Sequence, residues 1–499
     1  MNFSNLREKI VSIEQIKIGD LILVKPGEKI PVDGVIIDGE TSIDESTITG
    51  ESVPVDKKKG DFVIGATLNK QGRIIIEAKK IGKETVLSQI IELVKKAQMS
   101  KPPIQKLADL IASYFVPIII FLSILTFIFW SLKGGINVGL LNSISVLIIA
   151  CPCALGLATP IVLTLSLGKG ANNGILIKDG SIFEIISKAK IIVFDKTGTI
   201  TKGQIKVEKI IVNSNLKIKN DFEKYILNLA GSLEKFSEHP IGKAIYQYAK
   251  IKKFNVFNVD NFKAKTGFGV EGIINNKNIY IGKLLKEKDD FIEAINFKNQ
   301  GKTVVYVYEE KNLLGAIVVA DEIKNEAKTV IDKLKKLDYD TYLISGDNKK
   351  TVLSVGKKIG IKKENIFYEI LPQEKGKIIE KLKKENKKII FVGDGINDAL
   401  ALTKSDVGIS LKSGTDIAID SSQIILMNNN LETIIKTINL SKKSLSIIKQ
   451  NFFWAFFYNL ALIPLAMIGK INPMLASLAM TLSSLSVVFN SLRLKILKI

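Results

Sequence analysis

Residues 191–201 read IIVFDKTGTIT, an apolar run that ends on an aspartate and a glycine-containing turn. Such a run is typical of a strand buried on both faces of a parallel sheet. Residues 388–398, KIIFVGDGIND, have the same form, and a strand, turn and helix pattern at 337–360 lies between the two. Ligands bind at the carboxyl ends of strands in such sheets. The three stretches therefore predict one parallel α/β domain, interrupted by a further domain at 205–315, with a site at its strand ends.

The residues that follow these strands suit phosphoryl transfer. This reaction needs a nucleophile, Mg²⁺ held by hard oxygen ligands, and a cation that neutralises developing charge. Asp195 can supply the nucleophile, Asp394 the metal ligand and Lys375 the cation. A turn that merely uses Asp and Gly is the plain alternative, but the repeated strand-then-acid form argues against it. No G-x-x-x-x-G-K-[ST] motif occurs, which excludes a P-loop and makes a covalent aspartyl-phosphate the natural alternative.

Four stretches without a charged residue are long enough to cross a bilayer, which takes about 20 residues of helix. They are Leu110–Leu132, Gly134–Gly168, Gln450–Gly469 and Ile471–Leu492. Short connections join them into two helical hairpins. Because the flanking segments carry the Lys excess, the positive-inside rule predicts that the segments outside the hairpins are cytoplasmic.

Composition excludes few function classes. The net charge of +21 can indicate nucleic acid or an anionic membrane surface as a partner. No run combines dense Lys and Arg with aromatic residues, so we favour solvated basic surfaces and expect no nucleic-acid partner. The first residues, MNFSNLREKIVSIEQ, lack the apolar core of a signal peptide. Residues 13–80 alternate apolar and polar positions between Gly and Pro, which predicts a compact β-rich domain.

The only two cysteines lie in IIACPCALGLATP, residues 148–160. One intervening residue is too few for an unstrained disulfide, which indicates a reducing compartment or another use of the thiols. Pro152 would break a membrane helix between Cys151 and Cys153, and such breaks are tolerated where the backbone lines a cavity. Thiolates are soft ligands that select Cu(I), Zn or similar ions. Two small buried hydrophobic residues are the alternative.

Together, TGES (49–52), CPC (151–153), DKTGT (195–199), SGD (345–347) and GDGIND (393–398) resemble the heavy-metal P-type ATPases over essentially the whole chain. The resemblance implies a multidomain α/β membrane protein. Its expected parts are a β-rich actuator domain (1–85), a helical lead-in and transmembrane hairpin (86–169), a haloacid dehalogenase-like α/β phosphorylation domain (170–204 and 316–440), an inserted α+β nucleotide-binding domain (205–315) and a C-terminal hairpin (441–499), with four transmembrane helices in all.

The resemblance also implies residue roles, with ATP and Mg²⁺ as cofactors. Asp195 would be phosphorylated by ATP, with Lys375 and Asp398 supporting the phosphate. Glu51, on the turn Thr49-Gly50-Glu51, would position water for hydrolysis. Asp195, Asp394 and the main chain of Thr197 would hold Mg²⁺. The residues expected around the nucleotide and its phosphates are Glu234, His239, Gly267, Gly269, Gly282, Thr197, Thr199, Gly346, Asp347 and Asn397.

Two features qualify the nucleotide prediction. A lone histidine is more often structural than functional, and His239 is the only one in the chain. Its segment SEHP (237–240), followed by GFGVEG (267–272), resembles the nucleotide-binding domain of the heavy-metal class. Many relatives have Gly-Asn where this chain has Gly282-Lys283, so contacts with adenosine can differ there.

The remaining apolar spans imply the transported ion. Cys151 and Cys153, with Tyr458, Asn459, Met480 and Ser484, resemble the copper subgroup and imply Cu⁺ or Ag⁺. Zinc relatives place a lysine and an aspartate in the last two spans to neutralise a divalent ion, and these spans contain neither. A Zn²⁺/Cd²⁺ exporter is the alternative, and small residues such as Ser484 are also common in helix packing.

Copper relatives generally carry more chain before the actuator domain, including metal-binding domains and further helices. The resemblance therefore implies an N-terminally truncated Cu⁺-exporting ATPase, with a transport-inactive fragment as the alternative from another class. The expected partners are Cu⁺, a cytosolic copper chaperone and membrane lipid. The expected location is a bacterial plasma membrane, with several spans and the large domains in the cytoplasm.

Overall fold

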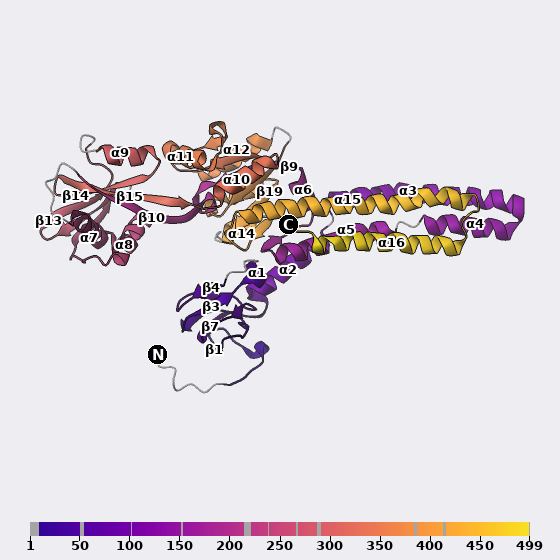
Figure 1. Ribbon diagram of the computed structural model, residues 1–499, viewed down its shortest axis with the longest axis horizontal. Coiled ribbons are helices and arrows are strands. Elements are labelled where there is room, and N and C mark those ends of the chain that lie inside the picture. The colour runs from indigo at the N-terminus through magenta and orange to yellow at the C-terminus, as the bar shows by residue number, and fades with distance from the viewer. Residues whose placement is uncertain are drawn as a thin grey trace. The chain divides into compact units, whose positions relative to one another are not determined.

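Figure 1 shows the computed structural model, which describes residues 9–49, 54–100, 102–150, 153–213, 221–237, 239–265, 268–286, 291–383, 387–412 and 416–498. The chain forms two compact units. The first comprises Met1–Ala189, Asp406–Lys412 and Ile419–Ile499, and the second comprises Lys190–Ser405 and Ser413–Ala418.

The first unit begins with the β-rich region that the alternating pattern predicted. One antiparallel sheet has the strand order β1-β7-β2-β5, and a smaller sheet has the order β4-β3-β6. Their bounds are β1 Leu21–Val24, β2 Asp33–Asp38, β3 Thr41–Asp44, β4 Val55–Lys57, β5 Phe62–Val63, β6 Leu68–Asn69 and β7 Ile74–Lys80, with a short helix α1, Ser46–Thr49. Val24, Ile36, Ile74 and their neighbours form its core, and each Å² of apolar surface buried there contributes roughly 25 cal/mol.

Long helices make up much of the rest of the first unit. Their bounds are α2 Val86–Met99, α3 Pro103–Gly134, α4 Ile136–Ile149, α5 Cys153–Ala171, α15 Glu432–Met467 and α16 Pro473–Ile496. α3 packs on α4, and α5 packs on both α15 and α16, so helices from distant parts of the sequence form one bundle (Figure 1). Within the described residues, three stretches are long and apolar enough to cross a membrane: Val86–Gly134, Ile136–Ala171 and Pro473–Ile496.

The predicted spans agree only in part with this bundle. Leu110–Leu132 lies within α3, and Ile471–Leu492 largely coincides with α16, while Gly134–Gly168 divides into α4 and α5. Gln450–Gly469 lies mostly in α15, which begins much earlier and is not among the three stretches found in the described part of the chain. This segment contains the polar side chains of Gln450, Asn451 and Asn459. The fourth predicted span therefore stays a prediction.

Buried polar groups join the helices of the bundle. Asn451, on α15, donates to Ser491 Oγ at 2.8 Å and to the carbonyl of Ala158, on α5, at 3.3 Å. The hydroxyls of Ser166 and Ser444 lie 2.7 Å apart. In apolar surroundings such hydrogen bonds hold helices in one register, so α5, which carries Cys153, is fixed against the last two helices.

The first unit also contains the strands β8 Ile175–Ile177, β19 Val407–Leu411 and β20 Ile424–Leu426, and the helix α6 Ile182–Lys188. β20 pairs parallel with β19 and antiparallel with β8. Ile48 and Ile64 of the β-rich region pack in one apolar cluster with Leu176 and Ile425 of these strands. The β-rich region is thus docked onto the strand group through a small hydrophobic contact.

The core of the second unit is the predicted α/β domain. Its strands neighbour one another in the order β17-β16-β9-β18, and β16 runs parallel to both β17 and β9. Their bounds are β9 Ala189–Asp195, β16 Asp340–Ile344, β17 Ile366–Phe367 and β18 Lys388–Gly393. The accompanying helices are α10 Ala327–Lys336, α11 Lys349–Ile359, α12 Pro372–Lys383 and α13 Ala399–Lys404.

The predicted insertion is a second sheet of the same unit, with the order β10-β15-β14-β13-β12-β11. Its elements are β10 Thr201–Val212, α7 Phe222–Glu234, α8 Pro240–Ile251, β11 Asp260–Lys265, β12 Gly269–Ile274, β13 Lys277–Gly282, α9 Ile292–Asn299, β14 Thr303–Glu309 and β15 Asn312–Ile323. Two separate apolar clusters, one including α7 and α8 and one including α9, pack with this sheet. The chain leaves the core along β10 and returns along β15, so these paired strands connect the two domains.

Candidate active site

Three strand ends meet at the predicted position. Asp195 is the last residue of β9, and Ile344 of β16 lies opposite it. β18 is the next strand on the other side of β9, and Asp394 follows it directly. Parallel strands present their carboxyl ends at one edge, so residues far apart in the sequence converge on Asp195.

Lys375 joins two of the acids. Its Nζ donates to Asp195 Oδ1 and to Asp398 Oδ1, both at 2.7 Å. The three side chains are at most 7% exposed. Burial disfavours the charged form of Lys375, but the two carboxylates together raise its pKa. The structure thus brings together the predicted nucleophile and the two residues predicted to support the phosphate.

The site carries more negative than positive charge. Carboxylate oxygens of Asp195, Asp394 and Asp398 all lie within 4.8 Å of one another. Burial and then the charge of Asp398 raise the pKa of Asp195, against the effect of Lys375. The same two causes raise the pKa of Asp394 to about 6. Clustered hard oxygen donors with excess negative charge suit Mg²⁺, so these residues fit the predicted cation.

The loop after Asp195 leaves room for further ligands. Thr199 is fully buried, and its hydroxyl has no hydrogen-bond partner within the described residues. A buried hydroxyl without a partner is costly, which suits the predicted contact with a phosphate. Gly198 has a φ of +73°, and a Cβ there would lie 1.8 Å from Asp394 Oδ2. The close approach of this loop to Asp394 therefore requires glycine.

We expect Gly198→Ala to displace Asp394 and abolish Mg²⁺-dependent phosphorylation. The left-handed backbone should also cost roughly 1–3 kcal/mol of stability. Gly60→Ala is the matched control, because Gly60 has a φ of +94° but nothing within 4 Å of an added Cβ. Phosphorylation assays and thermal unfolding of both variants distinguish the effect of a side chain on a left-handed backbone from the effect of the collision between the added Cβ and Asp394. Full phosphorylation of Gly198→Ala would contradict the required close approach.

Four further residues were predicted to lie around the nucleotide and its phosphates: Thr197, Gly346, Asp347 and Asn397. Lys196 is buried and forms an ion pair of 2.5 Å with Asp347 of the SGD segment. Gly346, Thr197 and Asn397 are exposed. An ion pair therefore connects Asp347, one of the residues predicted near the phosphates, to the loop after Asp195. The roles of the three exposed residues stay predictions.

Asp321 was not among the predicted site residues. Its Oδ2 accepts a hydrogen bond of 2.5 Å from Thr201 Oγ1. Thr201 Oγ1 also accepts from Gly198 N–H and lies 3.0 Å from the carbonyl oxygen of Lys196. Asp321 thus supports the conformation of the loop after Asp195 from the returning strand β15. The sequence offered one indication of Asp321, namely an acidic residue at the point where the inserted domain returns to the α/β domain. No glycine motif surrounds this residue.

The predicted nucleotide residues lie in the inserted domain. Glu234 ends α7 and is 6% exposed. The Nδ1 atom of His239 accepts from Ile241 N–H and caps α8, so one ring nitrogen has a structural role. A Cβ at Gly269 or Gly282 would lie 2.1 or 2.2 Å from a carbonyl oxygen of the other segment, which explains two of the predicted glycines by close backbone packing. Gly267 lies outside the described residues.

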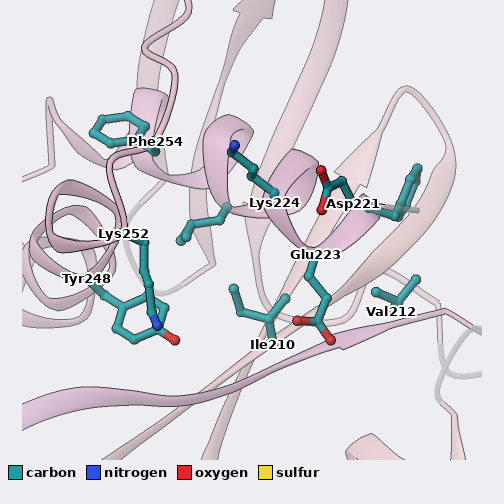
Figure 2. Close-up of a pocket in the computed structure, with 10 residues that line it drawn as sticks. Ile210, Val212, Asp221, Glu223, Lys224, Tyr248, Lys252 and Phe254 are labelled. Carbon is teal, nitrogen blue, oxygen red and sulfur yellow. The ribbon is translucent and has the colours of Figure 1, made fainter. Parts of the chain in front are cut away.

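A separate cavity of about 680 Å³ lies in the same domain. Ile210, Phe254 and other apolar side chains line it together with charged groups, among them Glu223 and Lys252 (Figure 2). None of the residues predicted to bind the nucleotide lines this cavity. It is therefore distinct from the predicted nucleotide site.

The predicted actuator residues are described only in part. Gly50 and Glu51 lie outside the described residues. Thr49 is buried, its hydroxyl donates to the carbonyl of Glu45, and its own carbonyl accepts from Asn428 Nδ2 at 3.2 Å. The first residue of the predicted water-positioning turn is thus anchored within the first unit.

The predicted copper ligands are likewise only partly described. Cys151 and the side chain of Cys153 lie outside the described residues. Tyr458 and Asn459 lie on α15, and Met480 and Ser484 lie on α16. Asn459 is buried and the other three are half-buried. α5 packs on both helices, and ligation of an ion by these residues stays a prediction.

Known proteins match this combination of domains. Residues 3–95 match the P-type ATPase actuator domain, and residues 189–406 match the haloacid dehalogenase-like hydrolases. A "Probable copper-importing P-type ATPase A" from Enterococcus hirae is 46% identical over 98% of this chain and 67% of its own length. A "Copper-exporting P-type ATPase" from Staphylococcus epidermidis is 43% identical over 99% of this chain and 62% of its own length.

A solved structure agrees with these matches. A zinc-transporting PIB-type ATPase in the E2.Pi state superposes with a TM-score of 0.70 and 28% identity, over 98% of this chain and 80% of that one. An actuator domain, a haloacid dehalogenase-like domain and a bundle of apolar helices together define the class of membrane ATPases that form a phosphorylated intermediate. The chain belongs to the P-type ATPase family. It spans about two thirds of the length of these two curated relatives.

Proposed function

We propose that this chain couples ATP hydrolysis to Cu⁺ export through an aspartyl-phosphate on Asp195. The single observation that carries the chemical step is the buried Lys375 ammonium, which lies 2.7 Å from both Asp195 and Asp398. Both relatives are named as copper-transporting ATPases, which supports the choice of ion. Because one relative is named as a probable importer and another as an exporter, the direction of transport is part of the proposal.

In the proposed reaction, a carboxylate oxygen of Asp195 attacks the γ-phosphorus of ATP. The bond between that phosphorus and the β–γ bridging oxygen breaks, and ADP leaves with the electron pair. Lys375 holds Asp195 in place and neutralises charge that develops on the transferred group. Bound Mg²⁺, held by Asp195, Asp394 and the Thr197 carbonyl, would add electrostatic stabilisation of the phosphate oxygens. Glu51 would then position a water molecule for attack on phosphorus. That attack would break the bond between phosphorus and the Asp195 oxygen, restore the carboxylate and release inorganic phosphate, which carries the hydroxyl group from water.

For the ion, we propose that Cys151, Cys153 and Met480 supply soft sulfur ligands. Two thiolates and a thioether suit a monovalent soft cation such as Cu⁺ or Ag⁺. Tyr458, Asn459 and Ser484 would provide polar orientation nearby. A cytosolic copper chaperone as donor, and a bacterial plasma membrane with the large domains in the cytoplasm, complete the proposal.

A Zn²⁺/Cd²⁺ pump is the second candidate, since the solved structure that superposes over nearly the full chain is that of a zinc-transporting ATPase. The last two apolar segments, 450–469 and 471–492, contain no acid or lysine. A divalent ion would therefore lack a neutralising charge from these segments. This observation favours the monovalent ion.

We expect Cys151→Ala/Cys153→Ala to lose Cu⁺-stimulated ATP hydrolysis in reconstituted vesicles, because the soft ligands are removed. The matched control is Met474→Leu, which removes a thioether at the start of α16 that is 83% exposed and should keep the stimulation. ATP-dependent loading of Cu⁺ or Zn²⁺ into the vesicles is measured in parallel. Stimulation by Zn²⁺ rather than Cu⁺ would favour the second candidate, and stimulation that survives in the double variant would place the ion elsewhere.

A further inference from the structure

A turn of the inserted domain packs directly against a helix of the α/β domain. Gly301 lies in the turn after α9 with a φ of +78°, and a Cβ there would lie 2.6 Å from the Cα of Thr351, on α11. The two backbones therefore approach this closely because residue 301 is glycine. The paired strands β10 and β15 also join the two domains, so the approach at Gly301 is an additional connection.

Two hydrogen bonds accompany this close approach. Ser354 Oγ, about one turn further along α11, donates to the carbonyl of Gln300 at 2.5 Å. Lys350 Nζ donates to Asn299 Oδ1 at 3.2 Å. Three consecutive residues of the inserted domain thus meet one end of α11, which fixes an orientation as well as a separation. We name the residues on both sides the docking contact: Asn299, Gln300, Gly301, Lys350, Thr351 and Ser354.

Helix α11 connects the docking contact to the predicted phosphorylation loop. Asp347, two residues before α11, forms the ion pair with Lys196 of that loop. Asn348 Oδ1 caps the helix by accepting from the Thr351 N–H at 3.0 Å. Residues of both domains line a cavity of about 530 Å³, and part of the docking contact lies in its wall together with Lys196 and Thr197. The position of the inserted domain is thus set with respect to the phosphorylation loop.

We propose that the docking contact positions the inserted domain for transfer of the γ-phosphate to Asp195. This inference rests on the proposed function, in which ATP is the substrate. A domain attached only by two paired strands can twist and bend about them, and a second attachment removes part of that freedom. Phosphoryl transfer depends on holding the reacting groups close together and in line. None of the residues in the docking contact is among those predicted to bind ATP, so the contact acts on the rate of phosphorylation and leaves the affinity for ATP unchanged.

Gly301→Ala tests the close approach. The added Cβ would push the turn away from α11, and we expect the single-turnover rate of labelling by γ-labelled ATP to fall about tenfold. The dissociation constant for ATP, measured without Mg²⁺ so that no phosphoryl transfer occurs, should stay the same. The matched control is Gly360→Ala. Gly360 follows α11 with a φ of +83°, and an added Cβ would meet other atoms only at 3.5 Å and beyond, so this variant has a comparable backbone strain without the collision.

Two exposed residues supply variants that leave the backbone unchanged. Asn299→Lys would place two ammonium groups opposite each other, and we expect it to lower the rate of labelling. Asn299→Lys/Lys350→Asn again pairs one lysine with one amide, in exchanged positions, and should recover the rate. Recovery by this exchange requires that the two side chains act on each other across the two domains.

Three results would overturn this inference while the proposed function stands. They are labelling of Gly301→Ala at the rate of the unchanged chain, an equal loss of rate in Gly360→Ala, and failure of Lys350→Asn to restore the rate of Asn299→Lys. A loss of ATP affinity that accounts for the slower labelling would overturn it as well. If the unchanged chain is not labelled by ATP, both the inference and the proposed function are wrong.

Discussion

Asp195→Asn should abolish acid-stable labelling of the chain by γ-labelled ATP. The amide is not nucleophilic, so the covalent step has no residue to carry it. The change is nearly isosteric, and Lys375 keeps its second partner, Asp398, at 2.7 Å. Burial already raises the pKa of Asp195, so replacing a carboxyl group that is costly to ionise should leave the thermal midpoint almost unchanged.

Asp340→Asn is the matched control for that experiment. Asp340 begins β16, the strand beside β9, and its exposed side chain pairs with Lys387. An exposed ion pair of this kind contributes about 0–1 kcal/mol, and labelling should be unaffected. Labelling of Asp195→Asn at the stoichiometry of the unchanged chain would show that another residue is the nucleophile.

The predictable part of the site follows from strand geometry. Asp195 and Asp394 each follow a buried apolar run, and parallel strands place such residues at one edge whatever their separation in sequence. Lys375 was predicted because phosphoryl transfer needs a cation. No local sequence pattern indicates that a residue of helix α12 lies beside two aspartates. Its two contacts depend on how α12 packs on the sheet, which is a tertiary property.

Asp321 shows what local patterns leave out. Its partner Thr201 lies 120 positions away in the sequence, and the contact exists only because β15 pairs with β10. The acid itself carries no turn or glycine signature. A hydrogen bond across the base of an inserted domain cannot be read from either strand alone.

The helices show a similar limit. The length of each stretch without a charged residue predicted the helices of the bundle well where the sequence is uniformly apolar, as in α3 and α16. α15 is continuous from Glu432 to Met467, although the apolar pattern begins only near Gln450. The charged first half stays helical because residues such as Ile434, Ile438 and Leu445 bury one face, and packing on one face suffices for a helix.

Lys375→Met should destabilise the protein more than either Asp195→Asn or Gly198→Ala. Methionine is close in size but leaves Asp195 and Asp398 without their common cation. Removing one partner of a buried charge pair costs about 3–5 kcal/mol, and no ATP-dependent labelling is expected. Lys377→Met, an exposed change on the same helix α12, is the matched control and should alter stability by less than about 0.5 kcal/mol.

The cost of Lys375→Met should also depend on pH. The carboxyl groups of Asp195 and Asp394 have raised pKa values in the folded protein. Lowering the pH from 7 to 5 therefore protonates these two groups in the folded state and removes their negative charge. The stability lost in the variant should therefore shrink at pH 5 and be largest at neutral pH and above. Denaturant unfolding at both values measures this difference.

A double variant, Lys375→Met/Asp398→Asn, separates charge from catalysis. Removing one uncompensated carboxylate should recover part of the stability lost in Lys375→Met, because the coupling between the two residues is then absent. Phosphorylation should stay lost, since no ammonium remains to neutralise the transferred group. If the double variant were no more stable than Lys375→Met, repulsion among the buried acids would not be the source of the loss. If Lys375→Met retained labelling, the cationic role assigned to Lys375 would be wrong.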